Sequence, residues 1–463
     1  MVQPANISTY IPNTSEDKAA MLKEIGFDNI IQLLIAAGVP EKFILPAGGL
    51  NLPPSMTEME LVEHMTEMAK RNRDLNSTTS VKGFGAYDHF SPAIMFEVMR
   101  YPGYLTAYTP YQPEVAQGKL QFNWESQSLT SRLTGMEVSN ASHYDGSTAM
   151  AASVIMAQDI IEKRDETLRN EILVSGAVHP AYLEVLKTFV RGKRIKVTRV
   201  RLDGGTVDLN DLEAKLTDKA LGFVTQTPNV FGLIEDTTQT TANLVHSKGG
   251  MYIVNVVEAT SMGLLKPGST GADIVVGEGQ ALGLPVSYGG PYWGMMTTKM
   301  EYIRDLPGRI SGLTRDKNGK RAWSLILVTR EQFSAREKAS SNICTNQALC
   351  FLSSGAYLIA TGEQGLREIA IRNAQGARYA QKQLIAAGCE PLFPGKSSYN
   401  EFALKLPRPM SEIKASFRRN GISGGVDLGP YYPQYSNVQL FCVTETTART
   451  DKIERLAEAI RHG

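Results

Sequence analysis

The segment from about residue 145 to residue 300 alternates between helical and strand patterns, and this alternation constrains the fold more than any other feature. The helical stretch GSTAMAASVIMAQDIIEK precedes the apolar run EILVSGAV, and the amphipathic HPAYLEVLKTFVR precedes the β-rich RIKVTRVRL. The strand patterns GFVTQT, MYIVNVVEA and DIVVGEG follow, with a helical pattern, TTQTTANLVHSKG, between the first two. Such alternation predicts an α/β fold with a mostly parallel central sheet covered by helices on both faces. Ligands in such folds bind at the carboxyl ends of the strands.

Two other regions flank this large domain, which we assign to residues 61–330. Residues 1–60 predict an N-terminal helical arm, because the patches DKAAMLKEIGF and NIIQLLIAAG are separated by proline-containing loops. Residues 331–463 predict a linking helix followed by a small C-terminal α+β domain, with strand patterns FALKLP and NVQLFCVTE and a final helix DKIERLAEAIRHG.

Composition and charge narrow the class of protein. The formal net charge of the 463 residues is +1, so the chain has no field that would attract nucleic acid or an acidic membrane. No run approaches the roughly 18 apolar residues that a membrane span needs. The first residues, MVQPANISTYIPNTSED, do not have the basic and apolar order of a secretory signal. We therefore expect a cytoplasmic protein that binds neither nucleic acid nor a membrane.

Cysteine and histidine spacing does not favour a metal site. The spacing of Cys344 and Cys350 predicts that both lie on one buried helix, and Cys389 and Cys442 are far from them in sequence. Free, buried thiols are the expectation for all four cysteines. The six histidines show no metal-ligand spacing, so we expect no bound metal.

The glycine-rich turn in ADIVVGEGQALG, residues 272–283, does not match a dinucleotide loop. Its spacing from Gly277 to Gly283 is one residue longer than the usual fingerprint. That fingerprint also requires a helix to follow, whose N-terminus meets the pyrophosphate. Here Pro285 and the cluster Gly289-Gly290-Pro291 interrupt any such helix.

The sequence Asp145-Gly146-Ser147-Thr148 opens the long helix rich in small residues. Free backbone N–H groups and two hydroxyls at a helix N-terminus suit a phosphate, because the donors and the helix dipole point at the ligand. An ordinary capped helix explains the same residues. Both interpretations remain open from the local sequence.

Two further polar residues follow strands in the same sheet. His179 follows EILVSGAV and Glu258 follows MYIVNVV. A phosphate cradle, a ring-stacking residue and an acid for a pyridine nitrogen occur in this order in a pyridoxal-phosphate site. Such a site next needs a lysine, which holds the cofactor's aldehyde as a Schiff base. The positions after DIVV provide none, since Lys266 precedes the strand and Lys299 comes well after it.

Six segments resemble one family over nearly the whole chain: GAYDHFSPAI, LTAYTPYQPEVAQG, LTGMEVSNASHYDGSTAMA, GADIVVGEGQALGLPVSYGGPYWG, REKASSNICTNQAL and NEFALKLP. They resemble the alpha subunits (subunit 1) of two-subunit glycine dehydrogenases (decarboxylating), the P-proteins of the glycine cleavage system. This resemblance implies the fold type I pyridoxal-phosphate architecture. It also implies an α2β2 assembly with a homologous beta subunit, which decarboxylates glycine and passes the aminomethyl group to the lipoyl arm of H-protein.

The resemblance also indicates the positions at which this chain differs from cofactor-binding relatives. Gln280 takes the position of the histidine that precedes the lysine in active relatives, and Ala281 takes the position of the lysine itself. Glu258 stands where the fold usually has Asp. With Gly146, Ser147, Thr148 and His179, these residues form a relic site. The resemblance implies that pyridoxal 5′-phosphate is held covalently by the beta subunit and not by this chain.

The contribution of this chain is expected further upstream. Tyr87, His89, Tyr108, Tyr111 and Glu114 lie in loops and are the catalytic candidates. They could line a shared cleft, hold glycine's carboxylate, steer the lipoyl arm or help to move protons. Alternatively, they build the subunit interface, where tyrosine is enriched. For the whole chain, the alternative to a subunit required for catalysis is a non-catalytic structural or regulatory partner that stabilises the lysine-bearing subunit.

Overall fold

The structure, a computed structural model, describes residues 13–45, 49–166 and 168–462. The chain divides into two compact units, Met1–Arg73 and Asp74–Gly463. Residues 1–12 and 46–48 of the expected N-terminal arm lie outside the described residues. The described helices of the first unit are α1 (Ser15–Glu24), α2 (Ile30–Ala36), η1 (Glu41–Phe43) and α3 (Glu58–Ala69).

The three α-helices described in the first unit begin at side-chain caps. Thr14, Asn29 and Thr57 each accept a hydrogen bond from a backbone N–H in the first turn. Such caps satisfy donors that have no partner within the helix. The positions of α1 and α2 match the two helical patches of the sequence.

The second unit contains a seven-stranded sheet of order β2-β10-β9-β8-β7-β3-β4. The strands from β9 to β4 are parallel, and β10 runs antiparallel to both β9 and β2. The predicted mostly parallel sheet is therefore confirmed. The strands are β2 (Val138–Ser139), β3 (Glu171–Ser175), β4 (Lys196–Val200), β7 (Ala220–Gln226), β8 (Met251–Val256), β9 (Ile274–Glu278) and β10 (Gly294–Thr298).

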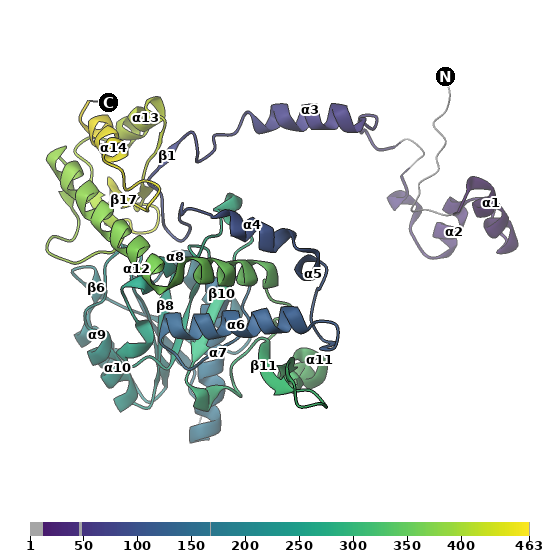
Figure 1. Ribbon diagram of the computed structural model, residues 1–463, viewed down its shortest axis with the longest axis horizontal. Coiled ribbons are helices and arrows are strands. Elements are labelled where there is room, and N and C mark those ends of the chain that lie inside the picture. The colour runs from purple at the N-terminus through teal and green to yellow at the C-terminus, as the bar shows by residue number, and fades with distance from the viewer. Residues whose placement is uncertain (1–12, 46–48, 167, 463) are drawn as a thin grey trace. The chain divides into compact units, whose positions relative to one another are not determined.

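Helices cover both faces of this sheet. The crossover through α8 (Pro180–Val190) leads from β3 outward to the edge strand β4. The crossovers through α9 (Leu209–Lys215) and α10 (Thr238–Ser247) lead from β4 to β7 and from β7 to β8, in the opposite direction across the sheet. Since such crossovers are right-handed, α8 lies on one face and α9 and α10 on the other. Figure 1 shows α9 and α10 in the same region of the drawing, at its lower left. Helix α7 (Gly146–Asp165) packs against α8 and the sheet.

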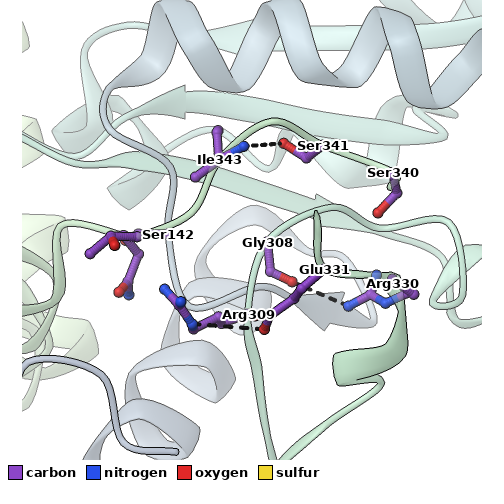
Figure 2. A pocket seen from close by; sticks show the side chains of 10 residues that line it. Ser142, Gly308, Arg309, Arg330, Glu331, Ser340, Ser341 and Ile343 are labelled. Carbon is purple, nitrogen blue, oxygen red and sulfur yellow. Dashed lines mark hydrogen bonds and ion pairs between the residues drawn. The ribbon is translucent and has the colours of Figure 1, made fainter. Parts of the chain in front are cut away.

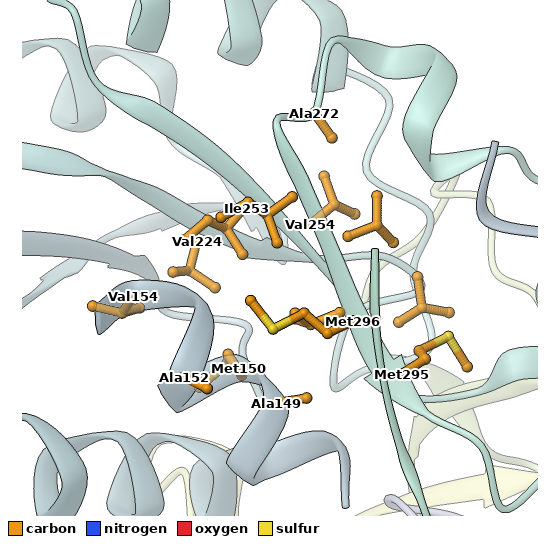
Figure 3. Packing of buried hydrophobic residues seen from close by; sticks show 14 of the residues in the cluster. Ala149, Met150, Ala152, Val154, Val224, Ile253, Val254, Ala272, Met295 and Met296 are labelled. Carbon is orange, nitrogen blue, oxygen red and sulfur yellow. The ribbon is translucent and has the colours of Figure 1, made fainter. Parts of the chain in front are cut away.

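Helix α7 forms the centre of the main hydrophobic core. Ala149, Met150 and Val154 are completely buried. In Figure 3 they lie beneath Val224 of β7 and Ile253 of β8. The small side chains along α7 bring its backbone close to the sheet, and burying a larger one such as Met150 stabilises the fold by about 1.5–3 kcal/mol. This packing fixes the N-terminus of α7 beside the carboxyl ends of the strands.

The remaining helices and strands of the second unit complete the large domain and form the C-terminal α+β part. Before the sheet come β1 (Thr79–Ser80), α4 (Ala93–Arg100), α5 (Pro102–Leu105) and α6 (Gln117–Thr134). Short elements between its strands are β5 (Leu202–Asp203), β6 (Thr206–Val207), η2 (Ala259–Gly263), η3 (Pro267–Thr270) and η4 (Ser287–Gly289). After it come η5 (Met300–Tyr302), β11 (Ile310–Arg315), β12 (Arg321–Ile326), η6 (Val328–Arg330), α11 (Gln332–Ala335), η7 (Arg336–Lys338) and α12 (Ala348–Ala386). The C-terminal part contains β13 (Glu390–Pro391), β14 (Glu401–Lys405), α13 (Met410–Arg419), β15 (Ile422–Ser423), β16 (Val426–Asp427), β17 (Val438–Cys442) and α14 (Thr450–His462).

The linking helix expected from residue 331 begins later than the sequence pattern indicates. Residues 339–347 are irregular, and the long helix α12 begins at Ala348. The hydroxyl of Ser341 accepts a hydrogen bond from the Ile343 N–H at 3.1 Å, which offers the backbone an alternative to the helix. The prediction that Cys344 and Cys350 share one buried helix is therefore wrong, because Cys344 precedes α12 and is only partly buried. The other three cysteines are free and buried, as expected.

None of the described helices combines the length and the apolar character that crossing a membrane requires.

The turn after β9 is tightly packed, which predicts a large effect of adding one methyl group. A Cβ on Gly279 would lie 2.0 Å from the Trp293 ring, and Trp293 is itself buried. We expect Gly279→Ala to lower the free energy of unfolding by about 1–3 kcal/mol through overpacking. Gly118→Ala is the matched control, because Gly118 lies in α6 with no atom near its Cβ position. It should raise stability by about 0.4–1 kcal/mol. Urea unfolding measures both, and equal values for the two variants would contradict the packing at Gly279.

Candidate functional site

Three donors of the candidate phosphate cradle at the start of α7 are hydrogen-bonded within the chain. The Gly146 N–H donates to Glu278 Oε2 at 3.0 Å. The Ser147 hydroxyl and the Thr148 N–H both donate to Asp145 Oδ1, at 2.8 and 2.7 Å. Asp145 therefore caps the helix, and the carboxyl group of Glu278 occupies the position that a phosphate oxygen would take.

Protein atoms also fill the space in front of the cradle. A Cβ on Gly146 would lie 2.5 Å from the Tyr182 hydroxyl oxygen and 2.9 Å from the Glu278 backbone nitrogen. Glu278 is buried, and this burial raises the pKa of its carboxyl group to about 8. At neutral pH the group is therefore largely protonated, which lowers the cost of holding it inside the fold.

His179 follows β3, as predicted, and begins helix α8. Its Nδ1 accepts a hydrogen bond from the Ala181 N–H at 3.2 Å, so its Nε2 carries the proton and donates to the Phe84 carbonyl oxygen, also at 3.2 Å. The Phe84 ring packs on the imidazole, with 4.2 Å between the ring centroids. Burial lowers the pKa of His179 to about 4, so the imidazole is neutral. The ring-stacking position is thus already covered by an aromatic side chain.

Phe84 adopts an unusual backbone conformation to reach this position. Its φ is +64°, in the left-handed region that bulky residues avoid. Holding a residue there costs about 1–3 kcal/mol, which the surrounding contacts have to offset. The Phe84 N–H donates to Glu401 Oε1 at 2.7 Å, and a Cβ on the preceding Gly83 would lie 2.2 Å from that same oxygen. Only glycine fits before Phe84.

Glu258 follows β8, as predicted, and lies in a buried hydrogen-bond network. Its Oε2 contacts His89 Nε2 at 2.9 Å and Asn400 Nδ2 at 2.5 Å, and its Oε1 accepts from Thr260. The other ring nitrogen of His89 lies 2.8 Å from Glu445. Although burial opposes the charge of His89, the two carboxylates outweigh that effect and raise its pKa to about 10. His89 is thus an imidazolium ion held between two acids.

Gln280, at the position expected to precede the lysine, forms two hydrogen bonds with the backbone of Tyr87. Gln280 Oε1 accepts from the Tyr87 N–H, and Gln280 Nε2 donates to the Tyr87 carbonyl oxygen, both at 2.9 Å. The Tyr87 hydroxyl donates to Glu401 Oε2 at 3.0 Å. Burial raises the pKa of Glu401 to about 8. Ala281, in the lysine slot, is completely buried.

The residues of this relic site do not fit pyridoxal phosphate. The cradle donors are bonded to carboxyl groups, the face of the stacking histidine is covered by a phenylalanine ring, and the acid is paired with an imidazolium ion. Each feature that would hold the cofactor has a partner from the chain itself.

Three of the catalytic candidates lie on a second, exposed surface. Tyr108 is 75% exposed, Tyr111 is 51% exposed, and Glu114 is also exposed. Arg309 donates to the Tyr111 hydroxyl at 2.8 Å and forms an ion pair with Glu331. By contrast, Tyr87 and His89 are buried in the relic site. The structure therefore divides the five candidates between two places.

Lys119 of α6 supports the loop that carries these tyrosines. Its buried ammonium group donates to the backbone carbonyl oxygens of Ala107 and Tyr108. Burial lowers the pKa of Lys119 to about 8, and nearby Arg309 adds to this shift. A small pocket of about 10 Å³, room for roughly one water molecule, adjoins this surface. Figure 2 shows Arg309 and Glu331 paired at its edge, with Arg330 directed toward Gly308.

Several of these residues carry no local sequence signal. Glu401 and Glu445 contact the relic site from the C-terminal part of the chain, and Arg309 comes from the β11 region. Phe84 does have a signal, because a large residue between two glycines indicates a special backbone conformation.

The raised pKa of Glu278 predicts how the stability of the fold changes with pH. The ordinary value is 4.5 and the folded value is about 8, so between pH 5 and 8 the folded chain keeps a proton that the unfolded chain has lost. Stability therefore falls as the pH rises through this range. Glu278→Gln keeps an acceptor for the Gly146 N–H but cannot ionise. It should remove up to about 1.4 kcal/mol per pH unit from this slope.

Urea unfolding at a series of pH values measures the effect. Glu213→Gln, an exposed position in α9, is the control and should follow the wild-type curve. A Glu278→Gln curve parallel to that of the wild type would contradict a protonated Glu278.

Comparisons with known proteins identify the relatives of this chain. The family model described as glycine cleavage system P-protein matches residues 8–459. A probable glycine dehydrogenase (decarboxylating) subunit 1 from Desulforamulus reducens is 42% identical, covering 97% of this chain and 98% of the relative. The protein of the same name from Thermomicrobium roseum is 41% identical, covering 98% of this chain and 99% of the relative.

Solved structures agree with this assignment. The inhibitor-bound glycine decarboxylase (P-protein) of the glycine cleavage system is 35% identical, with a TM-score of 0.86, covering 98% of this chain and 99% of that chain. A sphingosine-1-phosphate lyase from Burkholderia pseudomallei is 14% identical, with a TM-score of 0.64 over 89% of this chain and 91% of that one, and shares the fold alone. The expected fold type I architecture is confirmed. On this sequence and structural similarity, the chain belongs to the glycine cleavage system P-protein family.

Proposed function

We propose that this chain acts as subunit 1 of a glycine dehydrogenase (decarboxylating), in an α2β2 complex with a lysine-bearing beta subunit. The complex decarboxylates glycine, releases CO2 and passes the aminomethyl group to the lipoyl group of H-protein. Pyridoxal 5′-phosphate, held covalently by the beta subunit, supplies the electron sink for decarboxylation. We place the complex in the cytoplasm.

The observation that carries this proposal is that an alanine, Ala281, occupies the position of the cofactor lysine. Ala281 is buried at the carboxyl end of β9, where the covalent anchor of the cofactor is required. Lys299 does not replace it, because Lys299 pairs with Asp273 at the amino end of the same strand. A chain of this family without the anchor depends on a second chain for its chemistry.

We propose that the tyrosine loop, residues 107–114, is the contribution of this chain to a shared active site. Its two tyrosines are exposed yet held in place, since Arg309 bonds to Tyr111 and the Thr345 hydroxyl lies 3.0 Å from that of Tyr108. Aromatic side chains fixed in this way are suited to contact a partner and to orient a bound substrate.

Reconstitution tests the proposed division of labour. The full-length chain alone should show neither glycine–bicarbonate exchange with lipoylated H-protein nor cofactor trapped by borohydride. Addition of the beta subunit should produce exchange, with the trapped cofactor on the beta subunit only. Exchange activity or trapped cofactor in the lone chain would refute the proposal.

Removal of one hydroxyl tests the tyrosine loop. In the complex, Tyr111→Phe removes the acceptor for Arg309 and should reduce the exchange rate by roughly tenfold or more, because the loop loses its fixed position. Tyr379→Phe removes a hydroxyl from α12 that contacts Glu454 and should leave the rate unchanged. Wild-type exchange by an intact Tyr111→Phe complex would instead favour a purely structural role for the loop.

A further inference from the structure

One continuous segment contacts the residues expected to hold the cofactor ring. We call residues 83–89, Gly-Phe-Gly-Ala-Tyr-Asp-His, the strap. The strap contacts His179 after β3, Glu258 after β8 and Gln280 after β9. These are the carboxyl ends of three parallel strands, where a ligand binds in folds of this kind.

The partner groups of the strap match the chemistry of the cofactor part by part. The Phe84 ring contacts the imidazole of His179, tilted by 51° with 4.2 Å between the ring centroids, where a pyridine ring would stack. A cationic N–H from His89 meets Glu258 where a protonated ring nitrogen would meet the acid. Outside the strap, the Glu278 carboxyl group accepts from the N-terminus of α7 where a phosphate would accept.

We propose that the strap and Glu278 together form a built-in replacement for pyridoxal phosphate, which permanently fills the relic site of this chain. The site is therefore neither an empty cleft nor a weak second binding site. It is a closed part of the fold, and the cofactor is directed only to the chain that carries the lysine. This inference concerns the pocket of this chain and does not rest on the role of the tyrosine loop.

The backbone of the strap indicates that the filling is specific. Phe84 is held at φ +64° by hydrogen bonds at both of its peptide groups, because its N–H donates to Glu401 and its carbonyl oxygen accepts from His179. Tyr87 pairs through its N–H and C=O with the amide of Gln280. Entry of a pyridine ring would require all these bonds to break together. A left-handed conformation costs free energy for a phenylalanine, and a loosely packed loop would lack the contacts that offset this cost.

Removal of the filling groups tests the proposal. The probe is pyridoxine 5′-phosphate, which has the ring and phosphate of the cofactor but no aldehyde to react with surface lysines. The full-length wild-type chain should show no saturable binding by titration calorimetry. Phe84→Gly, which suits the positive φ, combined with Glu278→Ala should open the site and give saturable binding, with an affinity roughly a hundredfold above the weakest that the titration detects.

The control variant is Phe43→Gly, which removes an exposed ring from the first unit and should bind no more probe than wild type. Wild-type binding as tight as that of the double variant would overturn the proposal. So would a double variant that shows the wild-type circular dichroism spectrum and a cooperative melt yet fails to bind.

Hydrogen exchange of the wild-type chain decides the matter if the double variant does not fold. The amides of Phe84 and Tyr87 should exchange slowly, because both are hydrogen-bonded to side chains in the interior. Their rates should not change when pyridoxine 5′-phosphate is added. Rapid exchange of these amides without the probe, or faster exchange on its addition, would show that the strap is not a permanent occupant.

Discussion

The buried pair formed by Glu258 and His89 is the interaction on which the rest of the relic site depends. Both side chains are almost completely inaccessible to water, so neither charge is tolerated without the other. Removing one partner of such a pair typically costs about 3–5 kcal/mol. The pair joins the end of β8 to the strap, and Asn400 and Glu445 join it to the C-terminal part of the chain. One ionic network therefore holds together segments distant in sequence.

This requirement explains how a chain that lacks the lysine accommodates the polar residues of the relic site. The carboxyl ends of parallel strands place polar side chains and helix N-termini around one cleft. If no ligand satisfies them, the chain has to do so itself, since unpaired buried polar groups are costly. The Phe84 carbonyl oxygen, His89 and Glu278 meet that need. The tyrosine loop also satisfies two buried cations, Lys119 and Arg309, but its tyrosine rings remain exposed.

The parts of the molecule that the sequence predicts well are those set by local pattern. The strands of the sheet appear as apolar and β-branched runs, and α7 as a long stretch of small apolar residues after an Asp cap. Local pattern fails where side chains compete with the backbone, as in residues 339–347 before α12. Local pattern also does not distinguish Tyr87 and His89 from Tyr108 and Tyr111, which are close to them in the sequence. In the structure, the first two residues lie in a buried network and the other two lie on an exposed surface.

The sequence by itself determined the α/β class of the large domain, the family and the absence of a lysine in the turn that follows β9, because each depends on local pattern or residue identity. Only the tertiary structure decided what fills the place of the cofactor. The bond from the Phe84 N–H to Glu401 joins residues 317 positions apart, and no local propensity encodes such a contact. Contacts of this kind arise when the fold brings buried polar groups together and each has to find a partner.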